Sequence, residues 1–146
     1  MTQILFTKLY PQAKIPFRAT EHAAGFDLVC TDAVIQGNQV IVSTGLAVAF
    51  PPGHVLKVFG RSGLAFKHDI FLTNGVGIID ADYRGEIKLS FSSTTHTPAS
   101  MRNLLKIGDR VAQCILEKIP DVDWVEVEEL PESVRGEGGF GSTGSK

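Results

Sequence analysis

Paired cysteines and clustered metal ligands are missing from this 146-residue chain. Its two cysteines, Cys30 and Cys114, have no CxxC neighbour, and its four histidines are scattered without a paired metal-binding spacing. Disulfide frameworks and zinc sites both depend on such spacings. The sequence therefore predicts two ordinary thiols and indicates neither kind of cross-link.

Long apolar runs and a strong excess of one charge are also missing. No stretch reaches membrane-spanning length, and residues 1–6 lack the basic start and apolar core of a signal peptide. The formal net charge of -2 disfavours a nucleic-acid binder with a broad basic surface. We expect a cytoplasmic protein, or one in the host cytosol or nucleus if the chain is viral, without membrane or nucleic-acid partners.

No long amphipathic helix is present, and short β-prone segments alternate with turn residues instead. The chain length falls in the usual range of a single domain. Many short strands at this spacing indicate an all-β sandwich, barrel or jelly roll. One helical segment is expected at 61–67, where Ser62 could cap the first turn. The expected strands are 4–9, 40–42, 46–50, 54–59, 70–73, 86–91, 110–117 and 124–127.

The C-terminal segment 135–146 is rich in glycine and carries one arginine, one phenylalanine and several hydroxyls. On composition alone, the favoured interpretation is a floppy terminal tail. The alternative is a flexible clamp, in which Arg135 binds phosphate, Phe140 offers a flat face for a base, and glycines let backbone amides approach an anion. We expect a β domain over 1–134 and a flexible tail over 135–146.

Asp80 is the most conspicuous acid, because it follows the apolar pair Ile78 and Ile79. An acid there is costly to bury unless it has a partner or a task, which makes it a candidate general base. The alternative is a turn carboxylate that caps a hairpin together with Asp82. Tyr83 has its own simpler alternative, which is packing at the base of that hairpin.

Five clusters carry the strongest functional signal. They are residues 24–28 (AGFDL), 60–65 (GRSGLA), 74–87 (NGVGIIDADYRGEI), 108–113 (GDRVAQ) and 135–144 (RGEGGFGSTG). Together they closely resemble the five motifs of the trimeric dUTP pyrophosphatases (dUTPases), in family order and with similar spacing. The resemblance spans nearly the whole chain.

The resemblance implies a jelly-roll-like β-barrel that forms a homotrimer with active sites shared between subunits. It implies hydrolysis of dUTP to dUMP and pyrophosphate with Mg²⁺, which lowers dUTP and supplies dUMP for thymidylate synthesis. Asp80 matches the acid that activates the attacking water. Asp27 matches an acid near magnesium-bound water, an indirect role that suits an ion held mainly by the triphosphate.

The same match assigns the substrate contacts. Tyr83 is expected against the deoxyribose, where a 2′-hydroxyl would clash, and Phe140 over the uracil. The backbone near Asn74 is expected to contact the uracil edge, Gln113 the α-phosphate and Arg135 the γ-phosphate. The expected substrate-binding residues are Arg61, Ser62, Gly63, Asn74, Gly77, Ile78, Ile79, Tyr83, Lys88, Gln113, Arg135, Phe140, Gly141, Ser142 and Thr143.

Two other functions are compatible with parts of the sequence. A dCTP deaminase resembles dUTPases in fold and nucleotide but attacks the pyrimidine ring, and residues 79–83 together with the complete tail favour the pyrophosphatase. A non-catalytic regulatory protein could keep the barrel, although retention of Asp80 and Arg135 argues against lost catalysis. Fold alone does not separate these functions.

Some features carry no catalytic expectation. Phe26 stands where many dUTPases have tyrosine, which removes no reacting group. Asp109 is expected to cap a turn and to pair with the neighbouring Arg110. The segment 92–106 has no role that the resemblance assigns.

Overall fold

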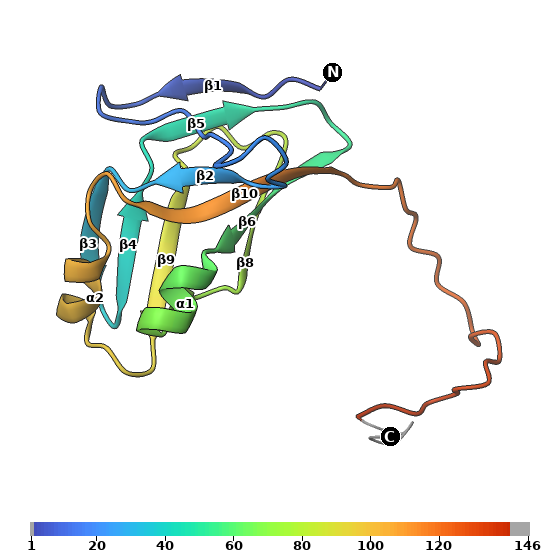
Figure 1. Ribbon diagram of the computed structural model, residues 1–146. Helices are drawn as coiled ribbons and strands as arrows, with labels where there is room; N and C mark the ends of the chain where they lie inside the picture. Colours follow the sequence, from blue (N-terminus) through green and yellow to red (C-terminus); the bar gives the residue numbers. More distant parts are fainter. Residues whose placement is uncertain (1, 141–146) are drawn as a thin grey trace.

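The computed structural model describes residues 2–140, whose ten strands form three antiparallel sheets (Figure 1). The strands are β1 (Leu5–Lys8), β2 (Phe26–Val29), β3 (Asp32–Gln36), β4 (Gln39–Ser43), β5 (Leu46–Ala49), β6 (His54–Gly60), β7 (Ile70–Leu72), β8 (Val76–Ile79), β9 (Lys88–Ser93) and β10 (Arg110–Lys118). One sheet pairs β1 with β5, and the other two have the orders β2-β10-β6-β8 and β3-β4-β9-β7.

The sheets enclose one hydrophobic core. Val40 and Val42 point inward from β4, and Leu89 and Phe91 do so from the neighbouring β9. Such alternation follows from the two-residue period of a strand, which places every second side chain on the same face. The result is a jelly-roll-like barrel whose strand pairing, within residues 2–140, does not close into a ring. The predicted all-β class is confirmed.

Seven of the eight expected strands are present, with ends that shift by no more than two residues. The expected strand at 124–127 is wrong, because these residues pair with no strand of the described chain. Three strands were not predicted, namely β2, β3 and β8. In β8, Gly77 interrupts the apolar pattern, and pairing of Gly77 with Val58 on β6 makes the segment a strand.

Two short helices, rather than the one expected, occur in the described residues. The first, α1 (Ser62–His68), overlaps the expected segment, but Arg61 is its N-cap and no side chain caps it. The expected cap by Ser62 is therefore wrong. The second, α2 (Pro98–Leu104), begins at a proline after Thr97, whose side chain accepts a hydrogen bond from a backbone amide.

The two cysteines are free and buried. Burial raises the pKa of the Cys30 thiol and of the Cys114 thiol to about 11. A thiol with so high a pKa stays protonated and unreactive at neutral pH. Both side chains therefore act as small apolar groups in the core.

Beyond β10 the chain leaves the body of the barrel (Figure 1). Residues 119–140 contain neither helix nor strand, and nearly all of them are exposed. Trp124, which is 98% exposed, is the largest apolar side chain in this segment. Among the described residues, no helix has the length and apolar character needed to cross a membrane.

Candidate active site

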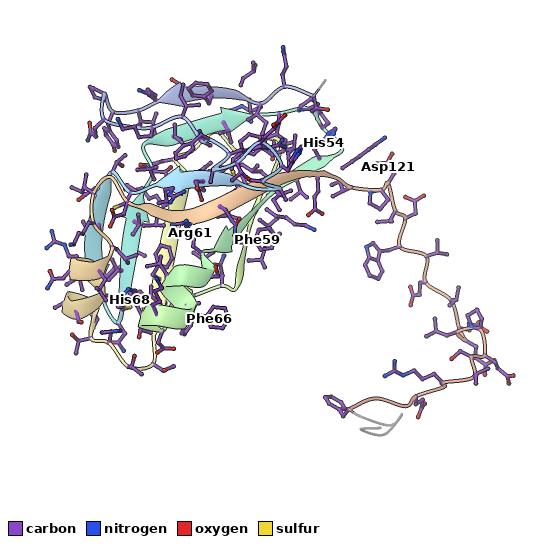
Figure 2. All side chains as sticks on the ribbon, in the orientation of Figure 1. His54, Phe59, Arg61, Phe66, His68 and Asp121 are labelled. Atoms are coloured by element: carbon purple, nitrogen blue, oxygen red, sulfur yellow. The ribbon has the colours of Figure 1, made fainter. Side chains whose placement is uncertain are left out.

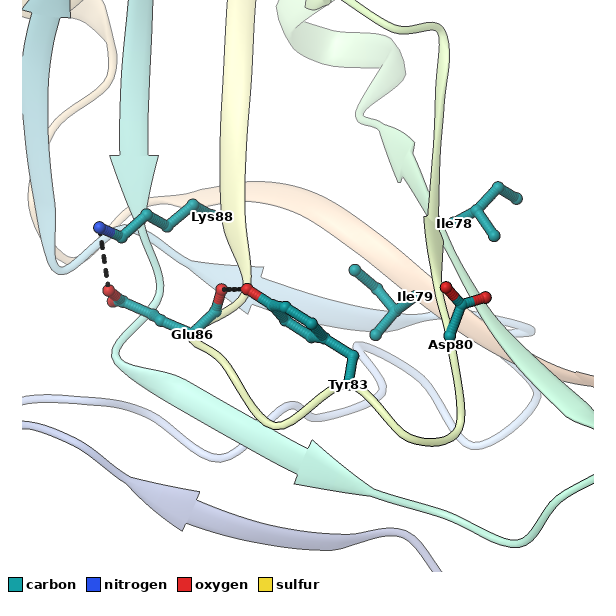
Figure 3. Close-up of a pocket in the computed structure, with 6 residues that line it drawn as sticks. All are labelled: Ile78, Ile79, Asp80, Tyr83, Glu86 and Lys88. Carbon is teal, nitrogen blue, oxygen red and sulfur yellow. Dashed lines mark hydrogen bonds and ion pairs between the residues drawn. The ribbon is translucent and has the colours of Figure 1, made fainter.

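A pocket opens beside the turn that follows β8 (Figure 3). Its volume is about 370 Å³, a size typical of small-molecule sites. The turn is closed by the Tyr83 amide, which donates to the Asp80 carbonyl at 3.1 Å. Six residues from the end of β8, the turn and the start of β9 line the pocket: Ile78, Ile79, Asp80, Tyr83, Glu86 and Lys88. Five of them were predicted, so the structure brings this part of the expected site together.

Tyr83 is held in one orientation. Its hydroxyl donates to the Glu86 carbonyl at 3.0 Å (Figure 3), while the residue remains 43% exposed. A Cβ at Gly85 would lie 2.6 Å from the ring carbon that bears the hydroxyl, so glycine is needed to admit the ring. The Arg84 guanidinium braces the turn by donating to the carbonyls of Ala81 and Tyr83 at 2.7 and 2.9 Å. The ring therefore presents a fixed apolar face.

Asp80 lies at the end of β8 with its carboxylate exposed to solvent. The cost of burying an acid, which drew attention to this position, therefore does not arise within one chain. No ion pair among the described residues engages Asp80, and neither Asp80 nor Asp82 makes the side-chain hydrogen bond that a turn cap requires. The Asp80 carboxylate is consequently accessible to a ligand or a water.

Glu86 is a pocket residue that sequence reasoning missed. Its carboxylate accepts a hydrogen bond from the Gly45 amide at 2.9 Å and lies 3.6 Å from the Lys88 ammonium. These contacts tie the hairpin to the residue before β5, while the Glu86 carbonyl orients Tyr83. No local pattern could have revealed Glu86, because Gly45 lies 41 positions earlier in the chain.

A second group of expected site residues gathers where β2, β10 and α1 meet. Asp27 is only 8% exposed, and its two oxygens lie 3.4 Å from Arg61 Nε and 3.0 Å from Arg110 Nη1. Arg61 also donates to the Arg110 carbonyl at 3.0 Å. A buried carboxylate needs partners of opposite charge, and Asp27 has two. This one acid therefore orients both guanidiniums. The expected pairing of Arg110 with Asp109 is wrong, because Arg110 pairs with Asp27 instead.

Gln113 lies beside this group. It is opposite Asp27 on β2 and opposite Phe59 on β6. A Cβ at Gly25 would come within 2.8 Å of Gln113 Oε1, so the glycine of the 24–28 motif leaves room for this amide. The structure thus places Gln113 and Asp27, two of the expected site residues, opposite each other on neighbouring strands.

Ser62 and Gly63 form the exposed start of α1, directly after Arg61. The surroundings of Gly63 are open, since a Cβ there would meet nothing within 4 Å. The Ser62 hydroxyl makes no cap bond to α1. Both residues are accessible to a ligand that approaches Arg61.

These two groups lie at opposite corners of one sheet. Asp27, Gln113, Phe59 and Val76 form a row across β2, β10, β6 and β8, and Asp80 is four residues beyond Val76. With strands about 4.8 Å apart and a rise of about 3.3 Å per residue, the Cα atoms of Asp80 and Gln113 are roughly 16 Å apart. A general base acts over about 3 Å, or through one water. In one chain, Asp80 and Gln113 are therefore too far apart for direct hydrogen-bond contact between their side chains.

Asn74 lies on the turn before β8 and does not line the hairpin pocket. The turn is built by Gly75, whose φ of 71° is in the left-handed region and whose amide donates to the Leu72 carbonyl at 3.0 Å. A Cβ at Gly77 would meet Val58 at 3.2 Å, so glycine lets β8 lie close to β6. Asn74 and Gly77 are thus placed along β8, toward the corner that holds Gln113.

The described residues do not fit a magnesium ion held by the protein itself. No group of three or more His, Cys, Asp or Glu side chains in residues 2–140 could hold a metal. Asp27, the expected indirect ligand, places both oxygens against arginines. Magnesium prefers several oxygen ligands and commonly takes them from substrate phosphates. Within residues 2–140, the side chains therefore offer magnesium no site made by the protein alone.

The two expected tail residues that the structure describes, Arg135 and Phe140, are exposed and belong to neither group. Arg135 and Phe140 lie in the exposed segment that leaves the barrel (Figure 1), and Arg135 Nε donates to the Gly138 carbonyl at 2.7 Å. The expected contacts of Gly141, Ser142 and Thr143 fall outside the described residues. Within the described chain, neither Arg135 nor Phe140 lines the hairpin pocket.

Comparison with known proteins decides the family. A family model described as dUTPase matches residues 11–144. The chain belongs to the dUTPase family. This membership confirms the family predicted from the five motifs.

Individual dUTPases are similar over nearly the whole chain. The deoxyuridine 5′-triphosphate nucleotidohydrolase of Corynebacterium glutamicum is 44% identical over 146 residues, 99% of this chain and 96% of that protein. The protein of that name from Wolinella succinogenes is 42% identical over 144 residues, 97% of this chain and 94% of that protein. A mutant Staphylococcus bacteriophage 80alpha dUTPase solved with dUpNHpp has a TM-score of 0.81 at 25% identity and covers 97% of this chain and 98% of that one.

Proposed function

We propose that this dUTPase-family chain hydrolyses dUTP to dUMP and pyrophosphate, with Asp80 as the general base. The observation that carries the proposal is the hairpin pocket, where an unpaired carboxylate stands beside a fixed tyrosine ring. The Asp80 carboxylate takes a proton from a water, whose oxygen forms a bond to the α-phosphorus. The bond from that phosphorus to the bridging oxygen breaks in line, and the electron pair leaves with pyrophosphate.

The sugar and base are selected on the same hairpin. The fixed face of Tyr83 packs against the deoxyribose, so the 2′-hydroxyl of a ribonucleotide clashes with the ring. Backbone groups along β8, near Asn74 and Gly77, pair with the uracil edge, and a further backbone contact comes from Lys88. Cytosine presents the opposite donor and acceptor pattern, and each unpaired buried polar group costs about 1 to 3 kcal/mol.

The phosphates bind at the corner that contains Arg61. Ser62 and Gly63 contact the α- and β-phosphates, Gln113 contacts the α-phosphate, and Arg61 supplies positive charge. A magnesium ion held mainly by the triphosphate would offset part of its negative charge, and Asp27 would contact that ion only through water. Phosphate binding competes with Asp27 for the Arg61 guanidinium, which lies 3.4 Å from that acid before the substrate arrives.

The active site is shared between subunits of a homotrimer. Support comes from the roughly 16 Å that separate Asp80 from Gln113 along the sheet, because the hairpin of one subunit can then meet the phosphate corner of another. Further support comes from residues 119–130, where Trp124 and Leu130 are 98% and 84% exposed. Val122, Val125 and Val127 are exposed in the same stretch, and a contiguous exposed apolar surface marks an interaction site.

The segment 135–146 closes over the substrate bound to a neighbouring subunit. Phe140 stacks on uracil, Arg135 contacts the γ-phosphate, and Gly141, Ser142 and Thr143 complete the phosphate contacts. An extended segment of this length reaches up to about 40 Å at ~3.3 Å per residue. In this proposal residues 1–134 are the barrel domain and its connection, and residues 135–146 are the closing tail.

The proposed reaction lowers dUTP and supplies dUMP for thymidylate synthesis. The location proposed for it is the cytoplasm, or the host cytosol or nucleus if the chain is viral. Pyrophosphate release is measured with dUTP, UTP, dTTP and dCTP in the presence of Mg²⁺. Rapid release from dUTP alone is the expected result. Ammonia release from dCTP would favour a deaminase. If none of the four nucleotides reacted, a regulatory protein would be favoured.

A further inference from the structure

The helix that carries the phosphate corner is weakly attached to the barrel. None of the side chains of α1 is buried, Phe66 is 91% exposed (Figure 2), and only Leu64 packs partly against the core. A helix of seven residues has little stability of its own and normally depends on tertiary packing. The position of α1 is therefore set by the groups that hold its two ends.

One end is held by Arg61 and its ion pair with Asp27. The other end is held by Asp69, the C-cap of α1, which adopts the left-handed conformation with φ 50° and ψ 34°. Its amide donates back to the Ala65 carbonyl at 3.0 Å. The side chain of Asp69 points away from the helix, toward the segment after β9. That segment lies close by, because Ile70, the residue after Asp69, pairs with Ser93 at the end of β9.

One oxygen of Asp69, Oδ2, lies within hydrogen-bonding distance of five donor groups. They are the Ser93 hydroxyl at 3.1 Å, the Thr94 amide and hydroxyl at 2.8 and 2.6 Å, and the Thr95 amide and hydroxyl at 3.0 and 3.1 Å. The Thr94 hydroxyl bond, followed by the other donors, lowers the pKa of Asp69 to about 2. The carboxylate is therefore ionised throughout the neutral range, when it is the better acceptor.

The segment that receives Asp69 is itself anchored to the core. It continues into α2, whose Met101 is only 1% exposed. Arg102 of the same helix donates from Nε to the Ala33 carbonyl at 2.7 Å. The donors therefore stand on a firmly packed part of the barrel. The Asp69 side chain links α1 to that part, in addition to the backbone pairing of Ile70 with Ser93 that follows it.

We propose that Asp69 is a positioning residue, which clamps α1 to residues 93–95 and so holds Ser62 and Arg61 in place for the substrate phosphates. The proposal rests on the proposed function in assigning those two residues to phosphate binding. It also gives residues 93–95 a role in a segment to which the motif match assigned none. The clamp acts through α1 and does not touch the substrate.

A simple helix stop would not need this carboxylate. Glycine and asparagine both accept the left-handed conformation at a helix end. Asp69→Gly therefore keeps the backbone and removes all five contacts, whereas Asp69→Asn keeps the shape and a neutral acceptor oxygen. The matched control is Thr31→Val, which removes a hydrogen bond at 2.9 Å from a buried hydroxyl to the Ser43 carbonyl, away from α1.

The kinetic test compares dUTP turnover with inhibition by deoxyuridine, which has no phosphates. We expect Asp69→Gly to lower kcat/KM for dUTP roughly ten- to a hundredfold, the range that misplacement by about 1 Å can produce. Deoxyuridine inhibition should be unchanged, and Asp69→Asn should recover most of the activity. Two results would overturn the proposal. One is that inhibition by deoxyuridine weakens as much as kcat/KM for dUTP falls, and the other is that kcat/KM for dUTP falls no further than in Thr31→Val.

Amide hydrogen exchange of α1, measured without nucleotide, tests the clamp independently of activity. Exchange at residues 64–66 should be faster in Asp69→Gly than in the unmodified protein and unchanged in Thr31→Val. Equal exchange in all three would show that Asp69 does not hold the helix. If the unmodified protein fails to hydrolyse dUTP, the proposed function is wrong. Amide hydrogen exchange would still show whether Asp69 holds α1.

Discussion

Two corners of the sheet β2-β10-β6-β8 differ in how their charged groups are satisfied. At the corner with Asp27, the acid and two arginines already bond to one another within a single chain. At the hairpin corner, Asp80 is exposed and makes no such pair among the described residues. The first corner is built before any ligand arrives, whereas the second keeps its acid available for reaction. Substitutions at the two corners should therefore affect different properties.

The largest effect is expected from Asp80→Asn at the hairpin corner. Loss of a general base typically lowers turnover about a hundred- to ten-thousandfold. Stability should change by no more than about 0.5 kcal/mol, because the side chain is exposed and unpaired. Turnover and thermal unfolding are measured side by side with Asp82→Asn as the matched control. Unimpaired turnover in Asp80→Asn would remove this residue from the mechanism.

A smaller but clear loss is expected when the chain is ended before Arg135. The described part of this tail packs on no sheet, so the truncated protein should fold, remain trimeric and unfold at the same temperature. Turnover should fall at least about tenfold, because a closing segment excludes water and completes the site. Light scattering and pyrophosphate release are the two measurements. An unfolded product would instead assign the tail a structural role.

At the opposite corner, Asp27→Asn should act mainly on stability. Removing the charge weakens two ion pairs with partly exposed arginines, and charge-assisted hydrogen bonds of this kind contribute about 1 to 3 kcal/mol. Urea denaturation should therefore show a lower free energy of unfolding. Asp121→Asn in the exposed segment is the control. An unchanged unfolding midpoint in Asp27→Asn would mean that the two corners do not differ as described.

The smallest effect is expected from Tyr83→Phe. This change removes one neutral hydrogen bond to the Glu86 carbonyl, a loss of about 0.5 to 1.5 kcal/mol, but keeps the ring. Discrimination between dUTP and UTP should survive in the ratio of their kcat/KM values. A collapse of that ratio would mean that the hydroxyl, rather than the ring face, selects the sugar.

Local sequence patterns predicted the strands that alternate strongly, such as β4 and β9, because alternation reflects burial on one face. They failed for β8, where Gly77 breaks the pattern and pairing with β6 determines the structure. They failed again for α2, whose place depends on burial of Met101. Both of these failures involve contacts between residues distant in the sequence, which no short window contains.

The site was predictable in its residue types and not in its arrangement. The motifs indicated Asp27, Arg61, Asp80 and Gln113, but not that Asp27 would lie between two arginines or that Asp80 would be exposed. Ion pairing across strands depends on register, and register follows from the packing of the whole sheet. Glu86 escaped notice for the same reason, since its partner Gly45 is brought near only by the fold.

The strand β9 has a consequence for mixed trimers. Its first residue, Lys88, lines the hairpin pocket, and its last, Ser93, binds Asp69 at the end of α1. If sites are shared between subunits, Asp80→Asn chains and Ser62→Ala chains should complement each other when co-assembled, because each supplies the half that the other lacks. Phe91, in the middle of β9, is fully buried. A destabilising substitution there should disturb both the hairpin pocket and the α1 end of the same chain. Such a chain should therefore rescue neither the Asp80→Asn chain nor the Ser62→Ala chain.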